Sequence, residues 1–263
     1  MAQHKPTARP VVLSIAGHDP SSGAGITADI KTIAAHRCYG VTCITALTVQ
    51  STRGVKQVEA VEGRMITQIL EELSTDLDIA AVKIGMLGSA EAARAVAAFL
   101  KRYQPRHVVL DPVLKSSSGA DLISKDGLQI LKARLLSMAS VITPNIDEAA
   151  MLSGLRVSNV EEMGVAALRL RQSGARNVII TGGHLDSPTD LISAESSKGA
   201  VTLAGTKIVS SSTHGTGCAF STALACNLAL GQSLVNAAKA AKHYVESSLK
   251  KAPAMGRGAG PVV

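Results

Sequence analysis

Short apolar runs alternate with stretches of helical periodicity along most of the chain. Residues 11–16 form an apolar run closed by Gly17, and apolar positions recur at helical spacing over 25–36, which predicts a strand, a glycine turn and a helix. The same order then repeats, with strands predicted at 41–49, 80–84, 107–110, 140–142 and 177–180 and helices at 62–73, 90–103, 128–136 and 161–172. This alternation is typical of a largely parallel sheet with helices on both faces.

The last third of the chain has a different pattern. Residues 190–193 and 201–209 can pair as a hairpin, and two long helical patterns follow at 218–230 and 234–249. Without an internal repeat or a linker, we expect one domain over 11–263 after a flexible arm at 1–10. The predicted fold is an α/β/α sandwich with a mostly parallel central sheet and a small hairpin. The polar segment 184–212 around this hairpin is expected to act as a mobile flap.

Composition narrows the class of protein. The 263 residues are 46% hydrophobic and 18% charged, and chains of this size often form one α/β domain. There is no Trp, and there are only two Phe and three Tyr, too few to stack the bases of single-stranded nucleic acid. The formal charge of +7 is spread along the chain, which is typical of a solvated basic surface and leaves open the steering of a phosphorylated substrate.

The cysteines and the apolar runs indicate in which cellular compartment the protein is expected. The four cysteines, Cys38, Cys43, Cys218 and Cys226, show no paired metal-ligand spacing and are expected to be reduced. The first apolar run is short and lacks a cleavage site, and no uncharged run reaches the roughly 18 residues of a membrane span. We expect a cytoplasmic protein without a membrane segment.

Ligands of open parallel sheets bind beyond the carboxyl ends of the strands, so we expect the functional residues in the turns that follow the strands. The first turn, residues 17–25, is rich in glycine, and Asp29 follows one turn into the next helix. Its amides can approach a ligand and Asp29 can accept hydrogen bonds from a polar heterocycle, although a purely structural turn has the same composition. The turn matches neither the dinucleotide motif nor the P-loop, which argues against a Walker-type ATPase.

A second turn, residues 211–220, leads into a helix with the sequence Ser-Ser-Thr-His-Gly-Thr-Gly-Cys-Ala-Phe. The glycines on either side of Thr216 leave unpaired amides at the positive end of the helix, an anion hole suited to a phosphoryl group in transfer. Cys218 lies in the first turn, where the helix dipole is expected to lower its pKa and let it accept a proton. The alternative is a small buried hydrophobe, the role we assign to Cys226.

These turns, with further segments, resemble the hydroxymethylpyrimidine/phosphomethylpyrimidine kinases of thiamine biosynthesis, members of the ribokinase-like superfamily. The matching segments run in order along nearly the whole chain, at 44–55, 83–87, 111–113, 143–149, 182–184, 214–218 and 258–262. The resemblance implies a ribokinase-like fold. It also implies transfer of the γ-phosphoryl group of ATP to the hydroxymethyl group of 4-amino-5-hydroxymethyl-2-methylpyrimidine, and a second transfer onto the monophosphate.

The resemblance also implies roles for individual residues. Asp29 and Gln50 would hold the aminopyrimidine edge, and the remaining substrate contacts would be Met86, Val113, Gly17 and Ala24. Cys218 would be the general base, and the anion hole would comprise Gly215, Thr216 and Gly217. ATP would be bound with Mg²⁺ by Asp111, Asn145, Glu148, Thr181, Gly183 and Thr213, the metal being held by Glu148 and Asp111 chiefly through water. Asn145 and Glu148 equally fit a helix N-cap and its partner, and both roles can coexist.

Some residues depart from the family pattern and keep alternatives open. Thr181 stands where the family commonly has Lys, so a cation for the nucleotide phosphates is missing or comes from elsewhere, for example from Lys115. The loop 116–120 and the turn residues His18 and Ser22 also differ. The rivals are a pyridoxal kinase on the same scaffold and a non-catalytic pyrimidine sensor. By resemblance we also expect a homodimer.

Overall fold

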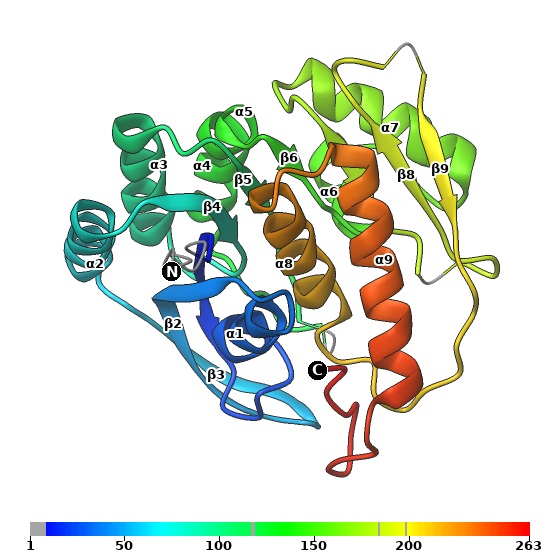
Figure 1. Ribbon diagram of the computed structural model, residues 1–263, viewed down its shortest axis with the longest axis horizontal. Helices are drawn as coiled ribbons and strands as arrows, with labels where there is room; N and C mark the ends of the chain where they lie inside the picture. The colour runs from blue at the N-terminus through cyan, green and yellow to red at the C-terminus, as the bar shows by residue number, and fades with distance from the viewer. Residues whose placement is uncertain (1–8, 117–118, 184, 198) are drawn as a thin grey trace, which may run out of the picture.

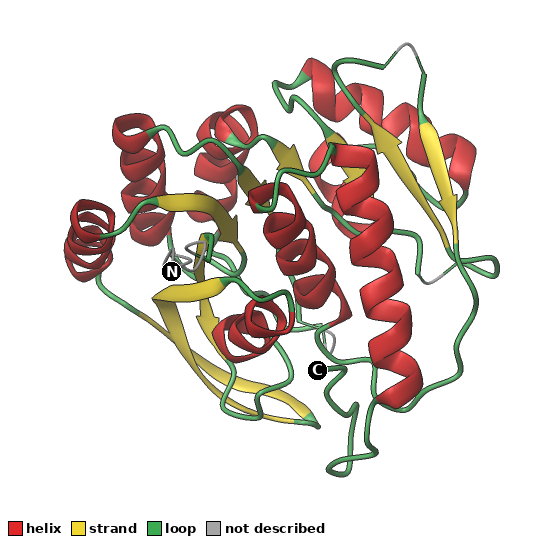
Figure 2. Ribbon diagram, in the orientation of Figure 1, coloured by secondary structure: helices red, strands yellow, loops and turns green. Residues whose placement is uncertain are grey.

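A twisted sheet with helices on both faces forms the body of the protein (Figures 1 and 2). The structure is a computed structural model that describes residues 9–116, 119–183, 185–197 and 199–263. Within these residues the strand order is β3-β2-β1-β4-β5-β6-β7-β8-β9. The run from β2 to β7 is parallel, whereas β3, β8 and β9 pair antiparallel with their neighbours. The strands are β1 (Val11–His18), β2 (Tyr39–Ser51), β3 (Gly54–Ala60), β4 (Ile79–Ile84), β5 (Val108–Leu110), β6 (Val141–Ile142), β7 (Val178–Ile180), β8 (Thr189–Ser193) and β9 (Val201–Ala204).

The helices form the two outer layers. On one face lie α1 (Gly25–Ala35), α8 (Thr216–Ala229) and α9 (Leu234–Lys251), with α8 packed on β1, β4 and β5. On the other face lie α2 (Gly63–Asp76), α3 (Ala90–Tyr103), α4 (Lys125–Ile130), the π-helical turn Leu131–Leu135, α5 (Leu136–Met138), α6 (Ile146–Ser153) and α7 (Val160–Gln172). None of the helices in the described part of the chain is long and apolar enough to cross a membrane.

The alternation of side chains along buried strands builds an apolar core on each side of the sheet. In β1, Val12 joins the core under α8 and α9, whereas Leu13 and Ile15 join the core under α2, α3 and α7. Because both faces are covered, the strand reads as a continuous apolar run rather than an alternating one. This confirms the predicted three-layer α/β/α architecture.

Some boundaries differ from the predictions. The second predicted strand runs on to Ser51 and folds back as β3, which the sequence analysis missed because its side chains are mostly exposed and follow no clear apolar pattern. The strand predicted at 201–209 ends at Ala204. A side chain at the next residue, Gly205, would collide with Lys242 and Glu246 of α9. The predicted arm lies mostly outside the described residues, although the Pro10 carbonyl accepts a hydrogen bond from Tyr39 at 2.9 Å.

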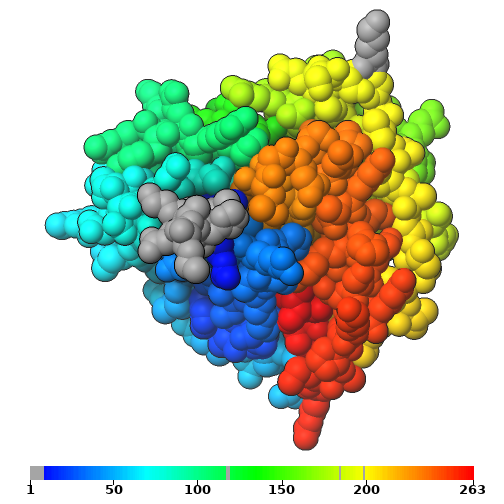
Figure 3. All heavy atoms as spheres, viewed as in Figure 1, coloured from blue at the N-terminus to red at the C-terminus, as the bar shows by residue number. Residues whose placement is uncertain are grey.

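The C-terminal tail forms hydrogen bonds to two turns that lie far apart in the sequence. Gly260 N donates to Ser211 O at 3.1 Å, and the backbone of His214 bonds to Gly260 and Val262. The amides of Arg257 and Gly258 reach Thr52 at the tip of the β2–β3 hairpin, at 3.2 and 3.3 Å. In Figure 3 this red segment fills the space between the blue N-terminal elements and α9. The tail therefore supports the turn that precedes α8.

Candidate active site

A cavity of about 740 Å³ lies beyond the carboxyl ends of the parallel strands. The turns after β1, β4, β5, β6 and β7 all contribute to it, together with the start of α8 and one side of α9. Its walls include the predicted site residues Gly17, Ala24, Gln50, Met86, Asp111, Val113, Asn145, Glu148, Thr181, Gly183, Thr213, Gly215, Thr216, Gly217 and Cys218. The sheet edge thus brings together residues that are up to two hundred positions apart in sequence, as expected for this topology.

Asp29 is the exception. Its side chain is fully buried below the cavity floor and does not line the cavity. Its carboxylate accepts hydrogen bonds from Thr222 at 2.8 Å, from Ser14 at 2.5 Å and from Lys83 at 2.9 and 3.0 Å. Both oxygens are thus bonded to protein donors, and the expected contact of Asp29 with the pyrimidine edge stays a prediction.

Lys83 is the functional candidate that the sequence analysis missed. It extends from β4 and is fully buried, with its ammonium 2.9 Å from the Asp29 carboxylate. Burial alone would lower its pKa, but the negative charge of Asp29 and the hydrogen bond to it outweigh that effect and raise the pKa. A buried lysine in an apolar strand is rare without a charged partner, and this was the available signal in the sequence. Lys83 therefore supplies fixed positive charge beneath the cavity.

The turn before α8 has the geometry expected of an anion hole. Gly215 adopts a left-handed conformation with φ of +86° as the N-cap of α8, and no side chain caps the helix. A side chain at this position would collide with the carbonyl of Gly23, so the turn after β1 and the turn before α8 are in close contact. Because the first amides of a helix lack intrahelical acceptors, this helix start can receive a negatively charged group.

Cys218 lies at the predicted place but with an unexpected pKa. Its thiol is partly exposed to the cavity, in the first turn of α8. Burial by the surrounding protein raises the pKa to about 12, aided by the charges of Asp111 and Asp29, while Lys83 and the Gly25 amide act in the opposite direction. The expected lowering by the helix dipole is therefore wrong for the protein without ligands. The resting side chain is a neutral thiol.

Asp111 and Glu148 are two buried carboxyl groups in the cavity wall. Burial and the charge of Asp111 raise the pKa of Glu148 to about 8, and burial raises that of Asp111 as well. Such mutual destabilisation of two carboxylates would be relieved by a cation between them. In the described residues no group of three or more His, Cys, Asp and Glu side chains could hold a metal ion alone. The pair suits a cation that keeps waters and phosphate oxygens in its coordination shell.

Asn145 and Glu148 also form the capping box that the sequence allowed. Asn145 Oδ1 accepts from the Glu148 amide at 2.8 Å, and Glu148 Oε2 accepts from the Asn145 amide at 2.9 Å. The capping interpretation is thus confirmed. It leaves Glu148 Oε1 with only a long bond of 3.4 Å from the Leu114 amide, so this oxygen retains capacity for another ligand.

Lys242 of α9 lines the cavity near the glycines that follow β7. Asp190 Oδ1 accepts from the Gly182 amide at 3.0 Å, and Oδ2 accepts from Lys242 of α9 at 2.9 Å. The side chain of Lys242 is only 13% exposed, whereas that of Lys115 is 52% exposed and lies 3.8 Å from Asp121. Thr181 and Gly183 line the cavity beside this pair. His184, the third residue of the predicted motif, and Ser117 and Ser118 of the predicted 116–120 loop lie outside the described residues.

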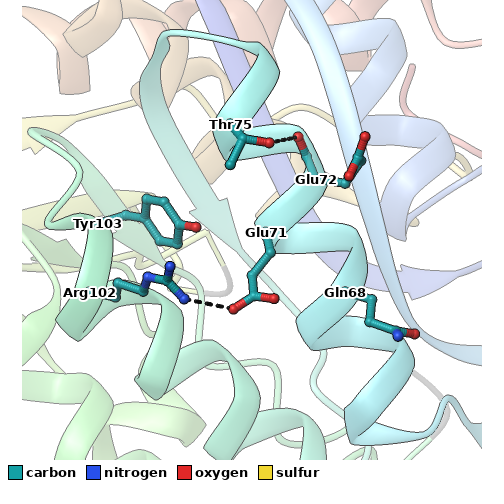
Figure 4. A pocket seen from close by; sticks show the side chains of 6 residues that line it. All are labelled: Gln68, Glu71, Glu72, Thr75, Arg102 and Tyr103. Carbon is teal, nitrogen blue, oxygen red and sulfur yellow. Dashed lines mark hydrogen bonds and ion pairs between the residues drawn. The ribbon is translucent and has the colours of Figure 1, made fainter.

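A smaller hollow of about 390 Å³ lies between α2 and α3, away from the sheet edge (Figure 4). Exposed side chains line it, among them Arg102 and Glu71, which form an ion pair of 2.8 Å. This pair is solvent-exposed and contributes little to binding or stability. The larger cavity is therefore the candidate active site.

The fold and this cavity define a class, the ribokinase-like small-molecule kinases. Residues 19–263 match the family described as phosphomethylpyrimidine kinase. The chain belongs to the hydroxymethylpyrimidine/phosphomethylpyrimidine kinase family.

Relatives and solved structures agree with this placement. The chain is 41% identical over 257 residues to the hydroxymethylpyrimidine/phosphomethylpyrimidine kinase of Rhizobium meliloti, covering 96% of each. It is 43% identical over 260 residues to the thiamine biosynthesis bifunctional protein ThiED of Geobacter sulfurreducens. That match includes 98% of this chain but only 52% of the longer relative, so the chain spans about half of that protein. The crystal structure of phosphomethylpyrimidine kinase from Clostridium difficile is similar, at 35% identity and a TM-score of 0.80, over 91% of this chain and 99% of that one. The ADP complex of Bacillus subtilis pyridoxal kinase is similar at 32% identity and a TM-score of 0.88, over 97% and 96%.

Proposed function

We propose that this protein uses ATP to phosphorylate 4-amino-5-hydroxymethyl-2-methylpyrimidine and then phosphorylates the monophosphate to the pyrophosphate. One observation supports the proposal most directly: the same cavity is lined by Gln50, Met86 and Val113 and by the unpaired amides at the start of α8. The first three offer an amide and two apolar faces for a flat heteroaromatic ring. The amides offer a place for the charge of the transferring phosphoryl group.

In the transfer, the hydroxymethyl oxygen forms a bond to the γ-phosphorus as the bond from that phosphorus to the β–γ bridging oxygen breaks. The amides around Gly217 stabilise the charge on the transferring group. Cys218 first loses its thiol proton to solvent water, which is unfavourable because its resting pKa is about 12, and the thiolate Sγ then accepts the hydroxyl proton. Lys83 and the Gly25 amide favour that ionised form. Magnesium held by Asp111 and Glu148 would supply positive charge to the phosphates.

We propose further that Lys242 provides the phosphate contact that Thr181 lacks. The two residues line the same part of the cavity, and Asp190 links the Lys242 ammonium to the backbone beside Thr181. The neighbouring Ile208, Val245 and Leu249 form an apolar wall suited to the adenine ring. Of the three lysines that line the cavity, Lys242 is 13% exposed, whereas Lys115 and Lys207 are 52% and 63% exposed, so Lys242 is held most firmly.

Replacing Lys242 with methionine should raise the KM for ATP about tenfold or more, because a charge-assisted hydrogen bond to phosphate is lost. The KM for the pyrimidine should stay close to that of the unchanged protein. Steady-state kinetics with each substrate varied in turn measures both constants, and Lys115→Met is the matched comparison. A larger rise for Lys115→Met than for Lys242→Met would contradict the assignment.

The function is tested by measuring ATP consumption with the pyrimidine, its monophosphate and pyridoxal as separate acceptors, with and without a chelator. Products are identified by mass spectrometry. We expect magnesium-dependent turnover of both pyrimidines. Faster turnover of pyridoxal would support the rival function that the similarity to pyridoxal kinases suggests. Tight pyrimidine binding with no turnover would support a sensor.

We also propose that the protein is a cytoplasmic homodimer. Leu47 and Val49 are 50% and 55% exposed on the side of β2 opposite Thr48 and Gln50, next to the edge strand β3. An apolar surface beside a free edge suits a partner subunit. Light scattering that gives a mass near 27.0 kDa rather than twice that value would exclude the dimer.

The flap expected at 184–212 stays a prediction, and hydrogen exchange there that does not slow when both substrates bind would contradict it.

A further inference from the structure

We propose that His214, held by Asp19, fixes the orientation of the Gln50 amide and thereby sets which edge of a heteroaromatic ring the cavity accepts. The inference rests on the proposed function in one respect, namely that Gln50 contacts the ring. His214 would then be a positioning residue. It lies in the anion-hole turn, whereas Gln50 lies on β2, and the two side chains are in contact.

The contacts of His214 determine its tautomer. Its Nε2 lies 2.8 Å from Asp19 Oδ2, and a carboxylate can only accept. Burial would raise the pKa of Asp19, but hydrogen bonds from His214 and Ser21 outweigh it and lower the pKa to about 2, so the group is ionised at neutral pH. Nε2 therefore carries a proton and donates a hydrogen bond to Asp19.

This protonation in turn determines the Gln50 amide. In the structure Gln50 Nε2 lies 3.1 Å from His214 Nε2, and Gln50 Oε1 lies 3.1 Å from Thr48 Oγ1. Thr48 Oγ1 donates its single proton to the His18 carbonyl at 2.9 Å, so toward Gln50 it can only accept. His214 Nε2 can only donate. Both neighbours are satisfied when the Gln50 amide is turned end for end. Its oxygen then shares the single Nε2 proton of His214 with Asp19 and its nitrogen donates to Thr48, because the two ends of an amide are assigned from such hydrogen bonds.

The His214 ring is also fixed in position. A side chain at Gly23 would collide with the ring, so the turn after β1 packs directly against it. The His214 amide donates to Gly260 O at 3.0 Å, and the His214 carbonyl accepts from Val262 N at 3.1 Å. Asp19 is held as well, by the amides of Gly23 and Ala24 at 3.2 and 2.9 Å. The orientation of Gln50 is therefore imposed by a rigid support.

An oriented amide can distinguish two kinds of ring edge. After its bonds to His214 and Thr48, Gln50 keeps one N–H donor and one acceptor lone pair. A 4-aminopyrimidine edge presents an acceptor nitrogen beside a donor amine and so complements this arrangement. A 4-oxo pyrimidine edge presents a donor N–H beside an acceptor oxygen and would require the amide to rotate. Rotation would place like groups against both His214 and Thr48, so the oxo edge is rejected.

The first test compares kcat/KM for the 4-amino substrate and its 4-oxo analogue. In His214→Leu the preference for the amine should fall about tenfold or more, because Gln50 can then rotate. His214→Gln restores a donor at the position of Nε2 and should recover most of the preference. His243→Leu, an exposed histidine outside the cavity, is the matched control. An unchanged preference in His214→Leu, whatever its overall rate, would overturn the proposal.

The second test needs no turnover. Long-range ¹⁵N–¹H NMR correlations of the protein without ligands report which ring nitrogen carries the proton, with the His214 signals identified by their loss in His214→Gln. We expect the Nε2-protonated form, and a ring protonated only at Nδ1 would overturn the proposal even if His214→Leu does not fold. If the unchanged protein phosphorylates no pyrimidine but shows this tautomer, the proposed function fails while the hydrogen-bond arrangement stands. If it phosphorylates the pyrimidine but the preference is independent of His214, only the present inference fails.

Discussion

Replacing Cys218 with alanine is expected to lower kcat by about 10²–10⁴-fold, the usual range for loss of a general base. The KM for the pyrimidine should change little, since the proton is transferred chiefly in the transition state. Because the active form is the thiolate and the resting pKa is about 12, kcat of the unchanged protein should rise with pH through the neutral and mildly alkaline range. Steady-state kinetics with the pyrimidine at several pH values measures both effects.

Cys226→Ala is the matched control for this prediction. Cys226 lies in the same helix but is buried in the core and does not line the cavity. Its replacement should lower stability without a large change in kcat. If Cys218→Ala retains the full kcat, another group accepts the proton and Cys218 merely packs against the substrate.

Replacing Lys83 with methionine is expected to lower the free energy of unfolding by about 3–5 kcal/mol, as when one partner of a buried ion pair is removed. The Asp29 carboxylate would remain fully buried, with only Ser14 and Thr222 as donors. Urea denaturation of the unchanged protein and the variant measures the difference. The double variant Asp29→Leu/Lys83→Met should recover much of the loss, because it removes both charges and leaves apolar groups of similar size.

Arg102→Met provides the comparison for an exposed pair. Arg102 and Glu71 are 68% and 46% exposed, so the loss should be at most about 1 kcal/mol. If Lys83→Met costs no more than Arg102→Met, the buried pair does not contribute to stability in the way the geometry indicates. Reduced pyrimidine affinity in a stably folded Asp29→Asn variant would show that Asp29 acts on the ligand through Lys83 and the cavity floor.

The helices and buried strands could be predicted because their patterns are local. The helix predicted at 90–103 occurs at Ala90–Tyr103, where Ser89 caps its start and Gln104 ends it in a left-handed conformation. The strand β3 could not be predicted, since it is stabilised by pairing with β2 rather than by an apolar pattern of its own. The apolar periodicity of a segment reflects which of its side chains are buried. An edge strand with few buried side chains therefore has no clear apolar pattern in the sequence.

The candidate site was predictable to the extent that it consists of turns at one sheet edge. Gly215, Gly217 and Cys218 lie where the motif and the topology require them. The pKa of Cys218 was not predictable, because it depends on burial and on the charges of Asp111 and Lys83, which come from other strands. The burial of Asp29 was not predictable for a similar reason, since its sequence neighbours do not reveal that it pairs with Lys83.

The sequence alone determined the α/β class, the order of elements, the turns that hold the chemistry and, through the ordered set of motifs, the family. These properties are encoded in short segments, whose periodicity and glycine positions act locally. Only the tertiary structure decided that Asp29 is a buried partner of Lys83, that Lys242 reaches the side of the cavity where Thr181 lacks a charge, and that Asp19 and His214 orient Gln50. Each of these depends on distances between side chains far apart in the chain, and hydrogen bonds and charges act over a few ångströms of space rather than along the sequence.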